Sequence, residues 1–467
     1  MKTKKQATLF HAFIPILVLM LSLAVGVLIY GADPHIPLLV AIIVAGLVAV
    51  FSLNYSWDEV EKGAIDTIQM SMQAILILMV IGALIGSWIL SGTVPAMIYY
   101  GLQLLSPGIF LIATVIICSI VSVATGSSWT TAGTVGIALM GVGQGLGMPA
   151  PIVAGAVVSG AYFGDKMSPL SDTTNLAPAM AGSTLFEHIS YMFYTTVPSL
   201  LISLVLYGII GMKYAGSVLD TTNIDIILSG LAGSFNISPW LMLPPIIVIV
   251  LVVLKMPALP GLISGTVIGG LFAAIFQGAG LGDIIDALHY GFASETGLEM
   301  VDELLTRGGL DSMMWTVSLI LLAMVFGGIM EKTGMLQAIG NAILKYANNT
   351  GSLVTATVLT SLAVNVLAAD QYLAIVIPGR MYKEVYDERG LEPRLLSRTL
   401  EDAGTLTSAL IPWNTCGAFM HSALLVSPLA FAPYAFLNII NPIIAIIYGF
   451  TGFSIKQDKS KSNVKSN

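Results

Sequence analysis

The chain has 467 residues, of which 56% are hydrophobic and 10% are charged, and its formal net charge is −7. A soluble domain carries about 25% charged residues, so this composition excludes an ordinary soluble protein and favours a membrane protein. The acidic balance speaks against nucleic-acid binding, which needs a basic face. The two cysteines, Cys118 and Cys416, and five scattered histidines fit neither a disulfide framework nor a zinc site. No cofactor is expected.

Apolar segments recur along the whole chain, and about 20 helical residues cross a bilayer. The first run, from Phe10 to Tyr30, is too long for a signal peptide and predicts a retained helix. Several later segments are short or interrupted by polar residues, which predicts broken helices. The predicted spans lie at residues 9–31, 34–53, 70–91, 108–124, 130–146, 150–164, 189–212, 238–254, 258–278, 313–331, 352–368, 371–381, 396–411 and 433–453.

The basic residues orient these spans. With the N-terminus in the cytoplasm, all Lys and Arg residues except Lys213 and Arg307 fall in predicted cytoplasmic segments. Because cytoplasmic loops carry the excess of Lys and Arg, both termini are expected to be cytoplasmic.

The chain also repeats itself at an offset of 242 to 245 residues. Asp58-Glu59 corresponds to Asp302-Glu303, the break at residues 125–128 to that at 368–371, and Ser168-Pro169 to Ile411-Pro412. The loop at 141–151 has no Lys or Arg, whereas its partner at 379–398 has several. The two repeats are therefore expected to have opposite orientations, as in many secondary transporters.

The expected fold is an all-α polytopic membrane protein with two inverted repeats, interrupted helices and re-entrant hairpins. Two tandem helical bundles without transport are the alternative. The expected segments are an N-terminal helix pair (1–55), the first repeat (56–212), a linker with a helix pair (213–299), the second repeat (300–453) and a basic cytoplasmic tail (454–467).

A polar segment interrupts the first repeat at residues 164–175. Its proline prevents a full set of helical hydrogen bonds, and freed carbonyls, hydroxyls and carboxylates are ligands for a hard cation such as Na⁺. The alternative is a solvated turn in which Asp165 pairs with Lys166. The candidate ion-binding residues are Asp165, Ser171, Asp172, Thr173 and Asn175.

The matching segment of the second repeat is Ile411-Pro412 followed by Asn414 and Thr415, which offer further oxygens. The alternative is a proline kink with Asn414 as a helix cap. Upstream, adjacent carboxylates point to different helix faces, so Asp402, with Thr405 on its face, is expected in the core. Glu401 is expected to pair with Arg398 at the cytoplasmic edge. Direct Na⁺ coordination is expected from Asp172, Asn175 and Asn414.

A third matched pair of breaks separates short helices at residues 125–131 and 365–371. Non-helical backbone at membrane depth must be buried in protein or line a wet cavity. Ser127, Ser128, Thr130 and Asp370 are therefore candidate substrate-binding residues. For Asp370, the alternative interpretation is a position in an external turn.

Ion exchange is expected because placing a charged side chain inside the bilayer is energetically costly. A carboxylate at bilayer depth costs at least ~2.5 kcal/mol, so it holds a proton when no cation is present, and a bound Na⁺ expels that proton. Competition at a site that opens to one side at a time is Na⁺/H⁺ antiport. An intramembrane metalloprotease is disfavoured because His-Glu-x-x-His is absent, and no enzyme activity is expected.

The segments Gly164-Asp165-Lys166-Met167-Ser168-Pro169-Leu170-Ser171-Asp172-Thr173-Thr174-Asn175 and Leu410-Ile411-Pro412-Trp413-Asn414-Thr415-Cys416-Gly417 resemble the NhaC family of bacterial Na⁺/H⁺ antiporters. The resemblance covers essentially the whole chain. It implies an ion-transporter superfamily fold, the bacterial cytoplasmic membrane and a homodimer.

Some members of that family resemble antiporters that take up malate with protons and expel lactate with Na⁺, and this chain is expected to do the same. A simple Na⁺/H⁺ antiporter and a Na⁺-driven carboxylate or amino-acid importer are the alternatives. The expected partners are Na⁺, H⁺, malate, lactate and the lipid bilayer.

Overall fold

The computed structural model describes residues 3–215 and 221–455, and within them the elements are helices joined by turns and loops, with an isolated β-bridge between Phe292 and Arg307. The cytoplasmic tail expected from residue 454 lies almost entirely outside the described residues. Within the described residues, eight helices are long and apolar enough to cross a membrane, and two bent pairs raise the number to ten. The predicted fold class, an all-α polytopic membrane protein with interrupted helices, is confirmed.

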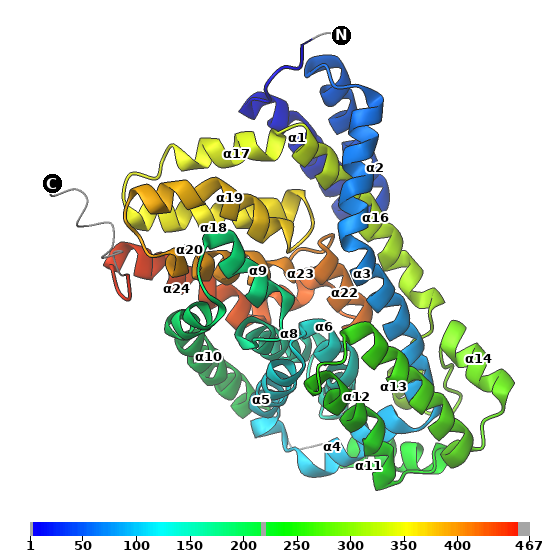
Figure 1. Cartoon of the computed structure of the whole chain (residues 1–467). Helices are drawn as coiled ribbons and strands as arrows, with labels where there is room; N and C mark the ends of the chain where they lie inside the picture. The colour runs from blue at the N-terminus through cyan, green and yellow to red at the C-terminus, as the bar shows by residue number, and fades with distance from the viewer. Residues whose placement is uncertain (1–2, 216–220, 456–467) are drawn as a thin grey trace.

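The first part of the chain forms two hairpin helices and then a run of long and broken helices (Figure 1). Its elements are α1 (Leu9–Leu23), η1 (Ala24–Ile29), α2 (His35–Leu47), η2 (Val48–Ser52), α3 (Trp57–Leu90), α4 (Thr93–Leu104), α5 (Pro107–Thr125), α6 (Ser128–Thr131), η3 (Ala132–Gly136), α7 (Ile137–Gly145), α8 (Ala150–Met167), α9 (Asp172–Ala181) and α10 (Leu185–Ala215).

A second hairpin and two short helices connect the halves. These elements are α11 (Thr221–Ser234), η4 (Pro239–Met242), α12 (Leu243–Val253), α13 (Ala258–Phe272), η5 (Ala273–Gln277), α14 (Leu281–His289) and α15 (Glu299–Leu305). The remaining elements are η6 (Asp311–Met313), α16 (Met314–Lys332), α17 (Met335–Leu344), α18 (Thr350–Leu367), α19 (Leu373–Glu388), α20 (Pro393–Leu400), η7 (Glu401–Thr405), α21 (Leu406–Ser408), α22 (Thr415–Leu424), α23 (Pro428–Phe431), η8 (Ala432–Tyr434) and α24 (Phe436–Thr451).

The order of elements from α3 to α10 recurs from α16 to α24. Residues with a left-handed backbone stand at matching places: Gly92 and Gly334, Gly126 and Ala369, Gly147 and Gly390, and Gly182 and Leu425. Left-handed residues end helices and set the direction of the next element, so matching positions give both halves the same sequence of turns. The internal repeat predicted from the sequence thus has a structural counterpart, while the opposite orientation of the repeats and the exact segment boundaries stay predictions.

The two long first helices, α3 and α16, pack side by side, and each also carries a hairpin from the other half (Figure 1). The hairpin α1–α2 precedes α3 but packs on α16, whereas α13 precedes α16 but packs on α3. At Gly86, α3 lies so close to Ala287 that no side chain fits: a Cβ there would lie 2.0 Å from the Ala287 carbonyl oxygen. These close contacts make α2, α3, α13 and α16 one interlocked layer.

A second layer contains α5, which packs on α8 and α10, and α18, which packs on α19 and α24. Two predicted spans contain a π-helical turn here. The span expected at 130–146 runs through α6, the π-helical segment η3 and α7, and that at 396–411 through α20, the π-helical segment η7 and α21. The short helices α4, α9, α17 and α22 were not predicted, because each is shorter than a membrane crossing.

Candidate functional site

Two helix breaks of the first half meet in the second layer. After α5, Gly126 takes a left-handed conformation (φ 69°). A Cβ at this position would lie 2.7 Å from the carbonyl carbon of Leu170 and 2.9 Å from the backbone nitrogen of Ser171. Glycine therefore lets the break before α6 lie directly against the break between α8 and α9.

This contact surrounds the Asp165 carboxylate with hydroxyl groups. Ser128, at the start of α6, donates to Asp165 Oδ2 at 2.6 Å, and Ser171 donates to Asp165 Oδ1 at 2.6 Å. All three side chains are buried. The alternative in which Asp165 pairs with Lys166 is wrong, because Lys166 binds Asp402 instead.

The polar contacts continue into the second half. The hydroxyls of Ser171 and Thr173 are 3.1 Å apart, and Thr173 donates to Glu401 Oε1 at 2.9 Å. Glu401 belongs to η7 and is fully buried. An unbroken chain of oxygens thus joins the carboxylates of Asp165 and Glu401 across the two repeats.

Asp402 lies in a separate ionic cluster beside that chain. Its Oδ1 accepts from Lys166 and, at 2.9 Å, from Thr195. Arg398 Nε lies 3.7 Å from Asp402 Oδ2, and its guanidinium stacks 4.4 Å from the ring centroid of Tyr191. Lys166, Arg398 and Asp402 are all completely buried, so each cation has a carboxylate or an aromatic face in place of water.

The expected pairing of Glu401 with Arg398 at the cytoplasmic edge is wrong. Both Glu401 and Asp402 are fully buried, although adjacent helical residues point to different faces. The reason is that their helix is surrounded: α20 and η7 pack against α9, α10, α18 and α19. Every face of such a helix is an interior face. Thr405 is also buried, and its hydroxyl makes no hydrogen bond to the described residues.

The breaks of the second half form an uncharged amide network. Asn414 donates through Nδ2 to Asn365 Oδ1 at 3.0 Å, and Asn365 donates to the Gly404 carbonyl at 2.7 Å. The backbone nitrogen of Thr415 donates to the Ala369 carbonyl at 2.8 Å. Asn414 Oδ1 also accepts from the backbone nitrogen of Cys416 at 3.0 Å, so the alternative role of Asn414 as a helix cap is present in the structure.

The remaining substrate candidates have local partners. Asp370 is buried and accepts from the backbone nitrogens of Tyr372 at 2.9 Å and Leu373 at 3.0 Å, which makes it the cap of α19. Ser127 accepts from the backbone nitrogen of Thr130 and caps α6. The hydroxyl of Thr130 itself is buried and makes no hydrogen bond to the described residues.

The three residues expected to coordinate Na⁺ directly are not brought together. Asp172 and Asn175 lie on the exposed side of α9, where the Asn175 amide donates to the carbonyls of Pro169 and Ser171. Asn414 is completely buried in the amide network. Among residues 3–215 and 221–455, no group of three His, Cys, Asp or Glu side chains is arranged to hold a metal ion.

Sequence reasoning missed Glu401, Lys166 and Thr195 as parts of the site. Glu401 and Lys166 each stand next to a predicted site residue, and two charges at adjacent positions in apolar surroundings were the available signal. Thr195 lies in an apolar span without any such neighbour, so only the fold identifies it.

Comparisons with known proteins agree with this architecture. The model of the Na⁺/H⁺ antiporter family matches residues 160–453. The Na⁺/H⁺ antiporter NhaC of Alkalihalophilus pseudofirmus is 39% identical, over 98% of this chain and 99% of its own. The arginine/ornithine antiporter ArcD of Halobacterium salinarum is 40% identical, over 97% and 94%. The malate-2H⁺/Na⁺-lactate antiporter of Bacillus subtilis is 37% identical, over 99% and 98%. The resemblance to the NhaC family is confirmed, and the chain belongs to the Na⁺/H⁺ antiporter family.

Proposed function

We propose that the oxygen chain from Asp165 to Glu401 is the place where Na⁺ and H⁺ compete, and that this competition drives the exchange of organic acids across a bacterial cytoplasmic membrane. The single observation that carries the proposal is the unbroken contact between two buried carboxylates through two hydroxyls. It joins the two repeats, which is where inverted-repeat transporters bind their substrates.

This chain has room for one proton. The Ser171 hydroxyl donates to Asp165 at 2.6 Å and the Thr173 hydroxyl donates to Glu401 at 2.9 Å, so neither has a hydrogen left for the 3.1 Å contact between the two hydroxyl oxygens. In the proton-bound state, a protonated carboxyl group of Asp165 or Glu401 donates to its hydroxyl, and that hydroxyl then donates across the 3.1 Å contact.

Loss of that proton creates a place for a cation. With both carboxylates ionised, the Ser171 and Thr173 hydroxyls point their hydrogens outward to the acids. Their oxygens then face each other at 3.1 Å with no hydrogen between them. Lone pairs of hydroxyl and carboxylate oxygens are ligands that hard cations prefer, so Na⁺ takes the place of the proton.

The charges of the buried cluster favour the same exchange. Asp165, Glu401 and Asp402 are acids, whereas Lys166 and Arg398 are bases, and all five are buried. The cluster therefore has one carboxylate in excess, and either H⁺ or Na⁺ brings its net charge to zero. Unpaired charge is costly at this depth, so the site is expected to be occupied by one of the two ions.

The other candidate residues are assigned supporting roles. Asp402 holds Lys166 beside the chain, and Thr405 offers a buried hydroxyl on the same π-helical segment as Glu401. Asn414 and Thr415 fix the breaks of the second half. Asp172, with Asn175 on the same exposed face of α9, attracts Na⁺ at the approach to Asp165. Ser127, Ser128, Thr130 and Asp370 shape the two matched breaks.

The organic substrates are proposed to be malate, entering with protons, and lactate, leaving with Na⁺; one relative is named a malate-2H⁺/Na⁺-lactate antiporter. Another relative of similar identity is an arginine/ornithine antiporter, so identity alone does not select the substrate. Both termini are proposed to be cytoplasmic and the protein to be a homodimer. A simple Na⁺/H⁺ antiporter is the second candidate, favoured by two of the relatives' names.

Infrared difference spectroscopy tests the competition directly. Adding Na⁺ to the purified protein in lipid should remove the carbonyl band of a protonated carboxylic acid. The band should be absent from Asp165→Asn and Glu401→Gln and present in Asp172→Asn. A band that Na⁺ does not change would contradict the proposal.

A pH-sensitive dye inside proteoliposomes tests the activity. Na⁺ pulses alone should move protons, and malate outside with lactate inside should increase that movement. Proton movement with Na⁺ but no response to malate and lactate would favour the simple antiporter, and no movement in either case would overturn the proposed function.

A further inference from the structure

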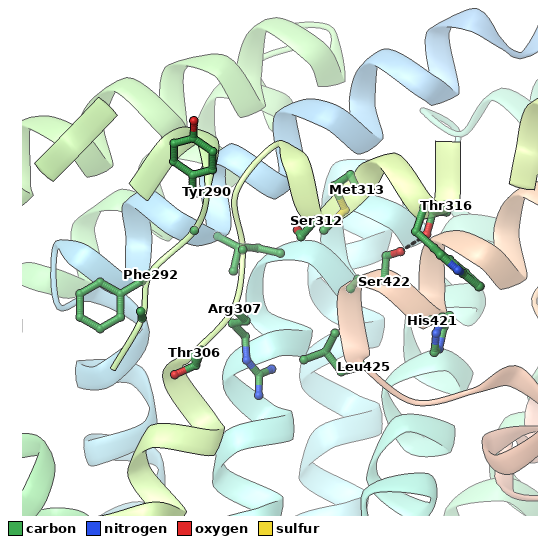
Figure 2. Close-up of a pocket in the computed structure, with 16 residues that line it drawn as sticks. Tyr290, Phe292, Thr306, Arg307, Ser312, Met313, Thr316, His421, Ser422 and Leu425 are labelled. Atoms are coloured by element: carbon green, nitrogen blue, oxygen red, sulfur yellow. Dashed lines mark hydrogen bonds between the residues drawn. The ribbon is translucent and has the colours of Figure 1, made fainter. Parts of the chain in front are cut away.

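A cavity of about 530 Å³ lies away from the ion site, between the two layers (Figure 2). The loop after α14, the loop before η6, the start of α16 and the end of α22 form its walls, and Ile85 of α3 completes it. Its size is within the usual range of small-molecule sites. None of its 16 lining residues is Asp or Glu.

Arg307 is the only charged residue among those that line the cavity. Its backbone is fixed by two 3.1 Å hydrogen bonds with Phe292, but its side-chain Nε is buried without a hydrogen-bond partner within the described residues. Burial lowers the pKa of Arg307 to about 10, so the guanidinium stays charged at neutral pH. A half-buried cation that forms no ion pair with any carboxylate of the described residues favours binding of an anion.

Other polar side chains line the same cavity. Figure 2 shows the Arg307 side chain extending between Thr306 and Leu425. Ser312 donates to the Gly309 carbonyl at 2.7 Å, whereas the Ser422 and Thr316 hydroxyls share one hydrogen bond, which leaves one of their two hydrogens for a ligand. Nδ1 of His421 is buried and has no hydrogen-bond partner among residues 3–215 and 221–455. A guanidinium with several neutral donors is a typical way to bind a carboxylate together with a hydroxyl group.

Helix α22 connects this cavity with the second-half break. It begins at Asn414 and Thr415 in the amide network and ends at the cavity with His421 to Leu425. Ten residues at about 1.5 Å each separate the two places by roughly 15 Å. Under the predicted orientation, Arg307 is external, so the cavity lies on the path from the outside to the interior.

We infer that this cavity is an external binding site for a small organic carboxylate without a positive charge, held by Arg307. The inference rests on the proposed function and identifies the class of its organic substrate. A hydroxy acid such as malate or lactate fits the donors. A cationic amino acid such as arginine does not, because the lining has no carboxylate to bind its basic end.

Equilibrium binding of radiolabelled malate to the purified protein, without ion gradients, tests this site. Arg307→Gln should weaken binding by about tenfold or more, because a hydrogen bond to a charged group contributes ~1.5–3 kcal/mol, and Arg307→Lys should restore part of it. Lys213→Gln is the matched control: it removes the other basic residue predicted to be external, outside the lining of the cavity. It should bind malate as the wild type does.

Competition separates the ligand classes: unlabelled lactate should displace malate, and arginine should not. No malate binding by the wild type, equal losses in Arg307→Gln and Lys213→Gln, or displacement by arginine would each overturn the inference. Proton movement driven by Na⁺ alone is measured separately on the wild type. If Na⁺ alone drives no proton movement in the wild type, the proposed function is wrong. The malate-binding result then decides by itself whether the cavity is a binding site.

Cysteine labelling tests the location of the proposed site. Ala293 lines the cavity and is exposed, whereas both native cysteines are buried. A membrane-impermeant maleimide added outside intact cells should modify Ala293→Cys, and malate should slow the reaction. Modification at the same rate with and without malate would contradict the proposed site.

Discussion

The two halves of the molecule use the same backbone breaks for different chemistry. In the first half, Ser128 donates to Asp165 at 2.6 Å. The residues 243 positions later are Gln371 and Ser408; the Ser408 hydroxyl lies 3.4 Å from Gln371 Oε1 and donates to the Thr405 carbonyl at 2.6 Å. The contact recurs in kind, but a carboxylate is present only in the first half.

A second matched pair is almost identical. Ser122 donates to the Ala161 carbonyl at 2.5 Å, and Asn365, 243 positions later, donates to the Gly404 carbonyl at 2.7 Å. The two halves are therefore alike where side chains hold the backbone in place, and they differ where side chains carry charge. In the second half, the carboxylate at the breaks is used as a helix cap. At the breaks of the first half, a carboxylate lies next to hydroxyls and caps no helix.

The largest expected effect in this comparison comes from Asp165→Asn. Without the carboxylate, the oxygen chain can neither share a proton nor bind Na⁺, so Na⁺-dependent proton movement should fall by roughly 100-fold or more, equivalent to about 3 kcal/mol. Dye-loaded proteoliposomes measure the change. Asp172→Asn, on the exposed face of α9, should reduce apparent Na⁺ affinity by no more than about fivefold, as expected for a surface charge.

The matched control for that prediction is Ser408→Ala, at the position equivalent to Asp165. It should keep most of the exchange activity, because its contact joins neutral groups. Equal losses in Asp165→Asn and Ser408→Ala would show that the charge asymmetry between the halves has no functional meaning.

Among the expected effects on stability rather than on transport, the largest is the loss of a buried ion pair. Lys166→Met leaves Asp402 with only Arg398 and Thr195, and removing one partner of a buried pair costs about 3–5 kcal/mol. Thermal unfolding in detergent should show a clearly lower midpoint. Combining it with Asp402→Leu should recover part of the loss, whereas an unchanged midpoint in Lys166→Met would mean that the pair does not stabilise the fold.

A smaller effect is expected at the matched left-handed residues. Gly126→Ala combines an unfavourable φ with a Cβ 2.7 Å from the Leu170 carbonyl carbon, so it should cost about 2–4 kcal/mol. Ala369→Gly, at the equivalent position (φ 56°), relieves strain but frees the unfolded chain, and should change stability by less than about 1 kcal/mol. Thermal unfolding of both variants checks the difference.

The smallest effect concerns the loop that carries Arg307. The backbone nitrogen of Thr296 and the Ser294 hydroxyl donate to Asp302 and hold the pKa of that carboxyl below its usual range. A lowered pKa means that the stabilisation is present above the ordinary value, about 3.9, and is lost as pH falls through the lowered one. The protection of the Thr296 amide against hydrogen exchange, relative to its intrinsic rate at each pH, should fall below about pH 4, and Asp302→Asn should remove that dependence.

Much of the fold was predictable because it depends on composition and spacing. Long apolar runs gave the membrane spans, and repeated glycine, proline and acidic positions gave the two halves. The short helices could not be found this way. Nothing in the apolar pattern of α22 separates it from its neighbours, since its ends are set by Asn414 and by the left-handed Leu425, a residue that rarely adopts this conformation.

The site was predicted only in part for a similar reason. The motif around Asp165 contains the oxygen ligands, and Asp402 was expected to be buried. The role of Glu401 depends on α20 and η7 being enclosed on all sides, and Arg307 faces a cavity formed by segments far apart in sequence. Asp172 was expected in the core because of its motif, but the turn at residues 168–171 directs it outward.

The crossing of each hairpin to the opposite half has a consequence for biosynthesis. His35 of α2 lies 3.1 Å from the carbonyl oxygen of Trp315 and 3.0 Å from the hydroxyl of Ser318, residues that leave the ribosome about 280 residues later. At roughly 5–20 residues per second, translation needs tens of seconds to supply α16. During this time the first hairpin lies in the bilayer without its packing partner α16. Cross-linking of ribosome-arrested chains of increasing length would show when α2 and α16 first come into contact.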